Sequence, residues 1–146
     1  MSKPKEAEAT FRIGFNCCQA VVTSLCRELG VPRKTALRIA TGFGGGMAHL
    51  GQTCGAVTGA IMLIGLAHGR VKASDDKPKL AAMKLVQKFA RRFTKLHGSI
   101  NCNELVGFDL GTSAGLEKAR AKGVFKTVCP VLVRDAARIV EKLLAK

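Results

Sequence analysis

Apolar residues recur along the chain at the spacing of helices, and no segment shows the alternation of a half-buried strand. After Asn16, for example, Ala20, Val21 and Leu25 share one helical face, and Gly30 marks the end of the segment. Capping and breaking residues divide the rest of the chain in the same way. The predicted helices lie at residues 4–14, 16–30, 33–40, 54–67, 79–96, from 101 onward, and 130–144. We therefore predict an all-α fold, a compact single-domain bundle of about six to seven helices with a glycine-rich loop.

Two of these helices differ sharply in polarity. The run from Ala56 to Ala67 carries no charge other than that of a nearby histidine, and we expect it to be a buried helix. It is too short and too rich in glycine to span a bilayer, which takes about 20 apolar residues. The helix over residues 79–96 is amphipathic. Its apolar stripe consists of Ala82, Val86, Phe89, Phe93 and Leu96, and its basic face of Lys84, Lys88, Arg91, Arg92 and Lys95.

Composition fits one domain over residues 1–146, of which residues 1–10 are the part that could be flexible. The first eight residues are charged and hold no apolar stretch, so they do not resemble a secretory signal and predict a cytoplasmic protein. The net charge is +14, and it is concentrated in residues 70–95. In a reducing cytosol, six cysteines are more often metal ligands, redox thiols or small buried residues than disulfides.

Four of the cysteines share a local context, because each stands where a helix is predicted to begin. Asn16, Thr53 and Asn101 are N-cap residues in front of three of them, and Pro130 suits the first turn behind the fourth. The positive end of a helix dipole favours an anion, so a thiol there is expected to ionise more readily than a free one. These cysteines are Cys17, Cys54, Cys102 and Cys129.

Their spacing alone is weak evidence for a site. The gaps of 37, 48 and 27 residues contain no Cys-x-x-Cys pair, so the pattern is neither a zinc ribbon nor a plant-type ferredoxin, and the four could simply be buried small residues. Cys18 and Cys26 occupy no capped start and are expected to fill the core. His49 could be a second-shell or fifth ligand or only a loop residue, and no histidine is assigned as a ligand.

The segment Thr41–Met47 has too many glycines for a helix or a strand and is predicted to be a loop whose backbone passes close to another group. No Gly-Lys-Ser/Thr follows it, so we expect no nucleotide. Gly44, Gly45 and Gly46 could bring bare N–H groups near a sulfur, or the loop could merely let helices pack closely.

Taken in order, the glycine and cysteine motifs resemble the C_GCAxxG_C_C family of redox-active proteins over roughly residues 11–137. The resemblance places the four signature cysteines of the family on Cys17, Cys54, Cys102 and Cys129 and implies redox or cluster chemistry. A more distant similarity is to the cluster-bearing helical domain of split-Soret cytochromes. The motifs are Gly14-Phe15-Asn16-Cys17, Gly42 to Met47, Cys54 to Ala60, Gly98 to Cys102, and Cys129-Pro130.

Three functions follow from these observations. The first is an electron carrier, sensor or oxidoreductase in which the four cysteines bind an iron–sulfur cluster or another metal. The second is a metal-free thiol–disulfide protein that uses the same residues. The third is a binding module whose basic face docks on an acidic protein or on nucleic acid, although the lack of Trp and Tyr leaves few stacking residues for nucleic acid. The chain has no Cys-x-x-Cys-His sequence, so no haem is expected. We expect no membrane partner, an acidic redox partner is favoured, and a homodimer is compatible with the sequence.

Overall fold

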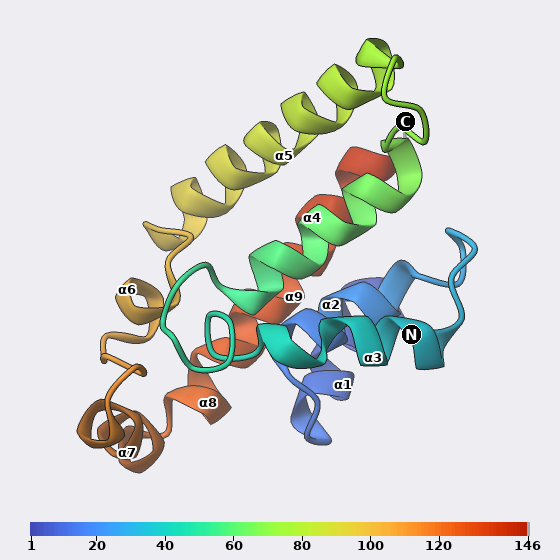
Figure 1. The fold of residues 1–146 in the computed structure, drawn as a ribbon. Coiled ribbons are helices and arrows are strands. Elements are labelled where there is room, and N and C mark those ends of the chain that lie inside the picture. The colour runs from blue at the N-terminus through green and yellow to red at the C-terminus, as the bar shows by residue number, and fades with distance from the viewer. Residues whose placement is uncertain (146) are drawn as a thin grey trace.

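Nine α-helices and one short 3-10 helix make up the fold of residues 1–145, the part of the chain that the computed structural model describes (Figure 1). The predicted all-α class is confirmed, and within these residues the only β-type pairing is an isolated bridge between Thr53 and Asn101. The elements are α1 (Lys3–Arg12), α2 (Cys17–Leu25), α3 (Arg33–Ala40), η1 (Thr41–Phe43), α4 (Gly55–His68), α5 (Asp76–His97), α6 (Cys102–Val106), α7 (Ser113–Lys122), α8 (Val124–Thr127) and α9 (Cys129–Leu144).

Local capping accounts for most helix boundaries. Asn16 and Gln19 form a reciprocal capping box at the start of α2, and Gly98 ends α5 in the left-handed conformation. Helices α7 and α8 were not predicted from the sequence. The apolar periodicity of α7 is weak, but the Thr112 hydroxyl accepts a hydrogen bond from the Gly115 amide at 3.0 Å, and Gly123 closes the helix in the left-handed conformation.

The long helices α4, α5 and α9 lie side by side (Figure 1). Helices α1 and α2 pack against α4 and α9. Helix α2 packs mainly on α4, and α1 packs on α9 and α2. The Phe89 and Phe93 rings stack at 5.9 Å between centroids in the core between the long helices. Other large side chains that are fully buried are Leu63, Ile64, Val57, Val133 and Val140.

Residues 1–10, which could be flexible according to the sequence, are helical from Lys3 onward, and Ala7 is buried where α1 packs on α2 and α9. Two expectations need correction. Leu96 is 62% exposed rather than part of the apolar stripe, because α5 turns His97 inward instead, where its Nε2 lies 3.0 Å from an oxygen of Asp135. Helix α4 is buried along its first half, but toward its end Leu66 is 44% exposed.

Candidate functional site

All four signature cysteines stand at helix starts. Cys17, Cys102 and Cys129 are the first residues of α2, α6 and α9. Cys54 is itself the N-cap of α4, where Thr53 was expected to be, and Pro130 occupies the second rather than the first helical position. The cap of α6 is Asn101, whose side-chain oxygen accepts a hydrogen bond from the Glu104 amide at 3.1 Å.

A two-residue backbone bridge fixes two of these cysteines relative to each other. The Cys54 amide donates to the Ile100 carbonyl at 2.8 Å, and the Cys102 amide donates to the Gln52 carbonyl at 2.6 Å. The two segments therefore pair as an antiparallel bridge just before their helices begin. As a result, the bridge holds the start of α4 next to the start of α6, and their cysteines lie close together.

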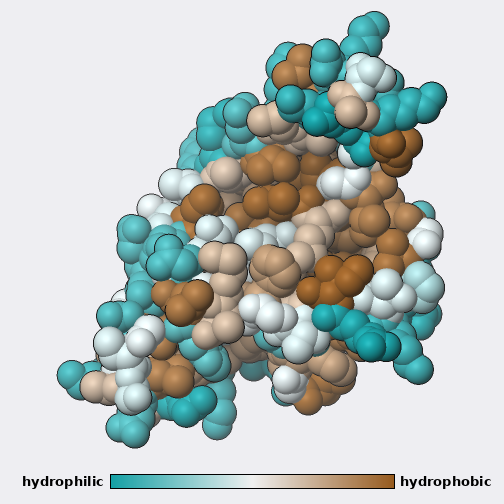
Figure 2. Space-filling model, viewed as in Figure 1, coloured by the Kyte–Doolittle hydropathy of each residue, from teal (hydrophilic) through white to brown (hydrophobic). Residues whose placement is uncertain are grey.

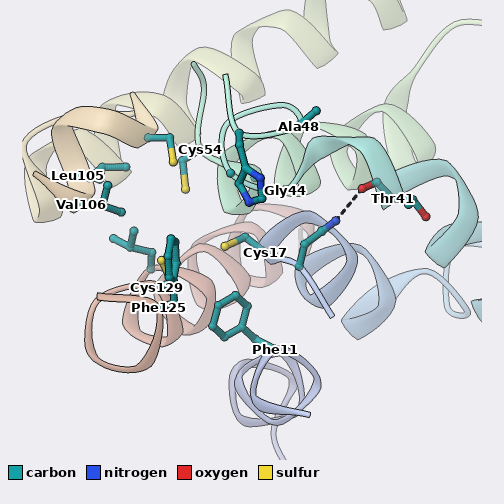
Figure 3. A pocket seen from close by; sticks show the side chains of 16 residues that line it. Phe11, Cys17, Thr41, Gly44, Ala48, Cys54, Leu105, Val106, Phe125 and Cys129 are labelled. Atoms are coloured by element: carbon teal, nitrogen blue, oxygen red, sulfur yellow. Dashed lines mark hydrogen bonds between the residues drawn. The ribbon is translucent and has the colours of Figure 1, made fainter. Parts of the chain in front are cut away.

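One cavity of about 320 Å³ brings the four cysteines together. The side chains of Cys17, Cys54 and Cys129 point their sulfur atoms toward this shared space (Figure 3). The four cysteines are between 3% and 9% exposed. Apart from Asn16, Thr41, the loop residues and Gly55, the rest of the wall is apolar and consists of Phe11, Leu105, Val106, Phe125 and Leu132. The cavity is therefore a mostly apolar chamber with thiols on several sides.

The glycine loop lies against this cavity. Gly44 and Gly45 line it, and a Cβ on Gly46 would come within 2.7 Å of the Cβ of Cys102, so only glycine fits beneath that cysteine. The N–H groups of these three glycines make no hydrogen bond within residues 1–145. Bare backbone donors thus border the thiols, and their role toward a sulfur or sulfide remains a prediction.

The loop also contains a left-handed turn that no local sequence pattern predicts. Gly45, Gly46, Met47, Ala48 and His49 all have φ between 49° and 69°. L-residues pay roughly 1 to 2 kcal/mol each in this conformation, and such strain tends to occur at functional sites. The turn brings Ala48 and His49 to the cavity wall, so His49 borders the site although its side chain is exposed.

The protonation of the thiols differs from the expectation that helix starts would ionise them. Burial raises the pKa of Cys54 to about 12 and that of Cys102 to about 11, even though backbone N–H groups of α4 act against the shift at Cys54. The pKa of Cys17 is raised because its thiol hydrogen-bonds to Cys129 and is buried. The same hydrogen bond lowers the pKa of Cys129. Desolvation is therefore the main reason that the pKa is raised at Cys54 and Cys102, whereas at Cys17 the interaction with Cys129 comes before burial.

The ionised sulfurs would repel one another across the cavity. A negative charge on Cys54, Cys102 or Cys129 raises the pKa of Cys17, and the other pairs interact in the same sense. Yet within residues 1–145 no group of three or more His, Cys, Asp or Glu side chains is arranged to hold a single metal ion. The four thiols are thus near neighbours around a space rather than a closed mononuclear site.

The other two cysteines lie outside the cavity, in the packed core. Cys18 and Cys26 are fully buried, and neither lines the cavity. The Cys18 Sγ contacts the Met62 Sδ at 3.8 Å, and the Cys26 Sγ lies 3.9 Å from the Thr23 carbonyl. The structure therefore separates four cysteines from two along the division drawn from helix starts.

A family model described as "Putative redox-active protein (C_GCAxxG_C_C)" matches residues 15–143, nearly the whole chain. The chain belongs to this family. No curated protein and no solved structure matches it. The description of the C_GCAxxG_C_C family indicates a redox-active protein. Among the described residues, no helix has both the length and the apolar character that crossing a bilayer requires.

This member of the C_GCAxxG_C_C family departs from the pattern in its name at two adjacent positions. The name has Gly-Cys before Ala-x-x-Gly, whereas here the order is reversed, with Cys54 followed by Gly55 and Ala56. A Cβ at position 55 would lie 3.0 Å from the Phe43 carbonyl oxygen and 3.1 Å from the Cys17 Cβ. The close approach of α2 and η1 therefore favours glycine at position 55, and the N-cap position supplies the sulfur.

Proposed function

We propose that the protein binds an iron–sulfur cluster through Cys17, Cys54, Cys102 and Cys129 and uses it for electron transfer or sensing. The observation that carries this proposal is the convergence of four helix starts, each bearing a thiol, on one cavity. Cysteine thiolates are the usual ligands of such clusters. Redox activity is the property that the family description gives.

The space between the sulfurs favours a cluster over a single ion. In a mononuclear zinc site, each sulfur lies about 2.3 Å from the metal. The described residues offer no such gathering of ligands, but they do offer a cavity of about 320 Å³ bordered by four thiols. An occupant with several metal atoms would reach sulfurs that one ion cannot.

The polarity of the chamber favours an anionic occupant. Four helices begin at its wall, and the positive ends of their dipoles face an anion favourably. The unbonded amides of Gly44 and Gly45 would donate hydrogen bonds to sulfur, a contact that tunes the potential of a cluster. When bound, the cluster would supply one-electron chemistry, and Phe11 and Phe125 would form part of the apolar wall beside it.

The raised pKa values bear on loading. Cys54 and Cys102 hold their protons at neutral pH in the absence of metal, so metal binding must release these protons. Loading should therefore weaken as the pH falls. The Cys129 thiol, whose pKa is lowered, is the one that would bind metal first.

Anaerobic reconstitution with iron and sulfide tests the proposal. We expect both elements to remain on the chain after desalting, with visible charge-transfer absorption that bleaches on addition of dithionite. Retention of iron without sulfide, or of neither, would contradict it. Zinc retained at one ion per chain would instead indicate a mononuclear site.

A metal-free thiol–disulfide function is the second candidate. It is favoured because the thiols of Cys17 and Cys129 line the same cavity and shift the pKa of each other in opposite directions. The Cys129 thiolate would attack oxidised glutathione and release one glutathione thiolate. The Cys17 sulfur, on losing its proton, would then displace the second glutathione. The two protein thiols become a disulfide, and the small disulfide is reduced to two thiols.

Peptide mapping after treatment with oxidised glutathione distinguishes the two candidates. A Cys17–Cys129 disulfide that forms and is reduced reversibly in a chain that retains no iron would favour thiol exchange. Mixed disulfides at random cysteines, or no oxidation at all, would exclude this pair as a redox couple.

A further inference from the structure

Two apolar grooves flank α4 on the side of the molecule that also carries α3 and α5. The first groove, of about 330 Å³, runs between α4 and α5 and is lined by Ile61, Ile64, Met83 and Val86. The second, of about 290 Å³, lies between α4 and the α2–α3 region and includes Ile39 and Leu66. Gly65 lines both grooves, so they adjoin. Figure 2 shows apolar atoms gathered over α4 and between α4 and α5 on this face.

The apolar side chains of this face are unusually open to solvent. Ile39 is 60% exposed, Met83 is 50% exposed and Leu66 is 44% exposed. Scattered apolar residues need no explanation, but grooves that adjoin and are rimmed by polar residues are typical of interaction sites. Met62 also lines the second groove, and its sulfur contacts Cys18, the neighbour of Cys17. The face and the cysteine cavity thus lie on the same pair of helices, α2 and α4.

The helices beside the grooves are strongly basic. Helix α3 has three basic and no acidic residues, and α5 has seven lysines and arginines against a single acidic residue, Asp76. None of these ten basic residues forms an ion pair with another residue of the described chain. Hydrophilic side chains border the apolar area along the outer edge of α5 (Figure 2). The face therefore combines apolar grooves with uncompensated positive charge.

We propose that this face of α3, α4 and α5 docks an acidic protein partner that inserts apolar side chains into the two grooves. Charge complementarity selects the partner, because Asp and Glu around an apolar ridge would pair with the free cations. A second copy of this chain would bring like charges together across the interface. An anionic membrane surface would meet the cations but has no ridge to fill two separate grooves. The inference does not depend on what occupies the cysteine cavity.

A designed acidic peptide serves as the probe. It is a labelled amphipathic helix of about 20 residues with leucines at positions i, i+3, i+4 and i+7 and glutamates on its remaining faces. Two control peptides keep parts of this chemistry: one scrambles the same composition, and the other replaces the glutamates with lysines. Fluorescence anisotropy should detect binding of the first peptide at least tenfold tighter than either control. High salt should weaken the binding severalfold.

Matched protein variants localise the binding. Met83→Gln and Ile39→Gln should each weaken peptide binding about tenfold, and Leu96→Gln, an equally exposed site on α5 outside the grooves, less than twofold. Reversal of Lys88 and Arg91 to Glu should slow association at low salt and hardly at all at high salt. The matched reversal of Lys118 and Arg120 on α7 should not. These residues are exposed or at the surface, and a thermal melt checks that each variant is folded.

Each other outcome would overturn the proposal. Equal binding of the scrambled peptide would mean that charge alone acts. Vesicles of anionic phospholipid that bind as well as the peptide, with the same loss in Met83→Gln, would identify a membrane surface. Self-association that Met83→Gln abolishes, measured by ultracentrifugation, would identify a second copy. Equal loss in Leu96→Gln and Met83→Gln would place the contact elsewhere.

Discussion

The two ends of the helix bundle use their apolar residues in opposite ways. Where α4, α5 and α9 run together, Phe89, Phe93 and Leu63 are fully buried and fill the interior. Where α2, α4, α6 and α9 begin, Phe125 and Leu132 instead border a space of about 320 Å³. The first region is a packed core, and the second is a core with a chamber left open.

The cysteines also differ according to whether they lie in the packed core or at the chamber. Cys18 is one residue from Cys17, yet it packs against Met62 in the filled region, while Cys17 faces the chamber. Both are buried, so burial does not separate a functional from a structural cysteine here. What distinguishes them is whether the residue lines the cavity of about 320 Å³.

Substitution of the two neighbours gives the largest expected contrast. Cys17→Ser should abolish iron retention after reconstitution, because a serine hydroxyl stays protonated where a thiolate must bind. Cys18→Ser should keep the iron and lower the free energy of unfolding by roughly 1 to 3 kcal/mol, if the buried hydroxyl lacks a partner. Iron per chain and thermal melts measure both effects. If the two variants behave alike, the distinction between chamber and core is wrong.

Removal of an aromatic ring should give the second-largest difference between the packed core and the chamber. Phe93→Ala should lower the free energy of unfolding by about 3 to 5 kcal/mol, because it opens a hole in a filled core. Phe125→Ala, the control, should cost clearly less, since its ring is half-buried and already borders empty volume. Urea denaturation of the metal-free proteins measures the difference, and equal losses would show that the chamber is as tightly packed as the core.

The stability of the protein at alkaline pH should show that a thiol is buried in the packed core. Burial raises the pKa of Cys18 to about 11, from an ordinary value of 9.0. The unfolded chain ionises first, so the stabilising contribution is fully present below pH 9.0 and is lost as the pH rises through about 11. Between these two pH values, the free energy of unfolding should fall by up to about 3 kcal/mol less in Cys18→Ala than in the parent protein. Denaturation curves of both proteins from pH 8 to 11 measure this. A difference in the free energy of unfolding that stays constant over this range would contradict the prediction.

The smallest effect concerns the left-handed turn at the chamber. Ala48→Gly should raise the free energy of unfolding by up to about 1 kcal/mol, because glycine adopts a φ of 49° without strain. Ala81→Gly, inside α5 and beyond its first turn, should lower it by a similar amount. Paired thermal melts test this, and destabilisation by both substitutions would mean that the turn is not strained.

Helix boundaries and cysteine context could be predicted from the sequence because capping is local. Asn16 and Asn101 act within three residues of themselves, and the caps alone singled out Cys17 and Cys102. The short helices α7 and α8 were not predicted because they lack an apolar stripe.

The chamber and its protonation depend on distant contacts, which no local pattern encodes. The bridge between Thr53 and Asn101 joins segments 48 residues apart. The left-handed φ of Met47 is rare for an L-residue and has no sequence signature. The raised pKa of Cys54 comes from burial among several helices, so its helix start alone predicted the wrong direction.

The position of Cys129 at the start of the last helix has a consequence for assembly in the cell. The nascent chain exposes Cys17 early, but the chamber closes only after α9 has been synthesised and has packed on α1 and α4. Until then, Cys17, Cys54 and Cys102 have no fourth partner. Delivery of an occupant to all four cysteines would therefore follow the synthesis of α9, and a product that ends before α9 would lack one of the four thiols.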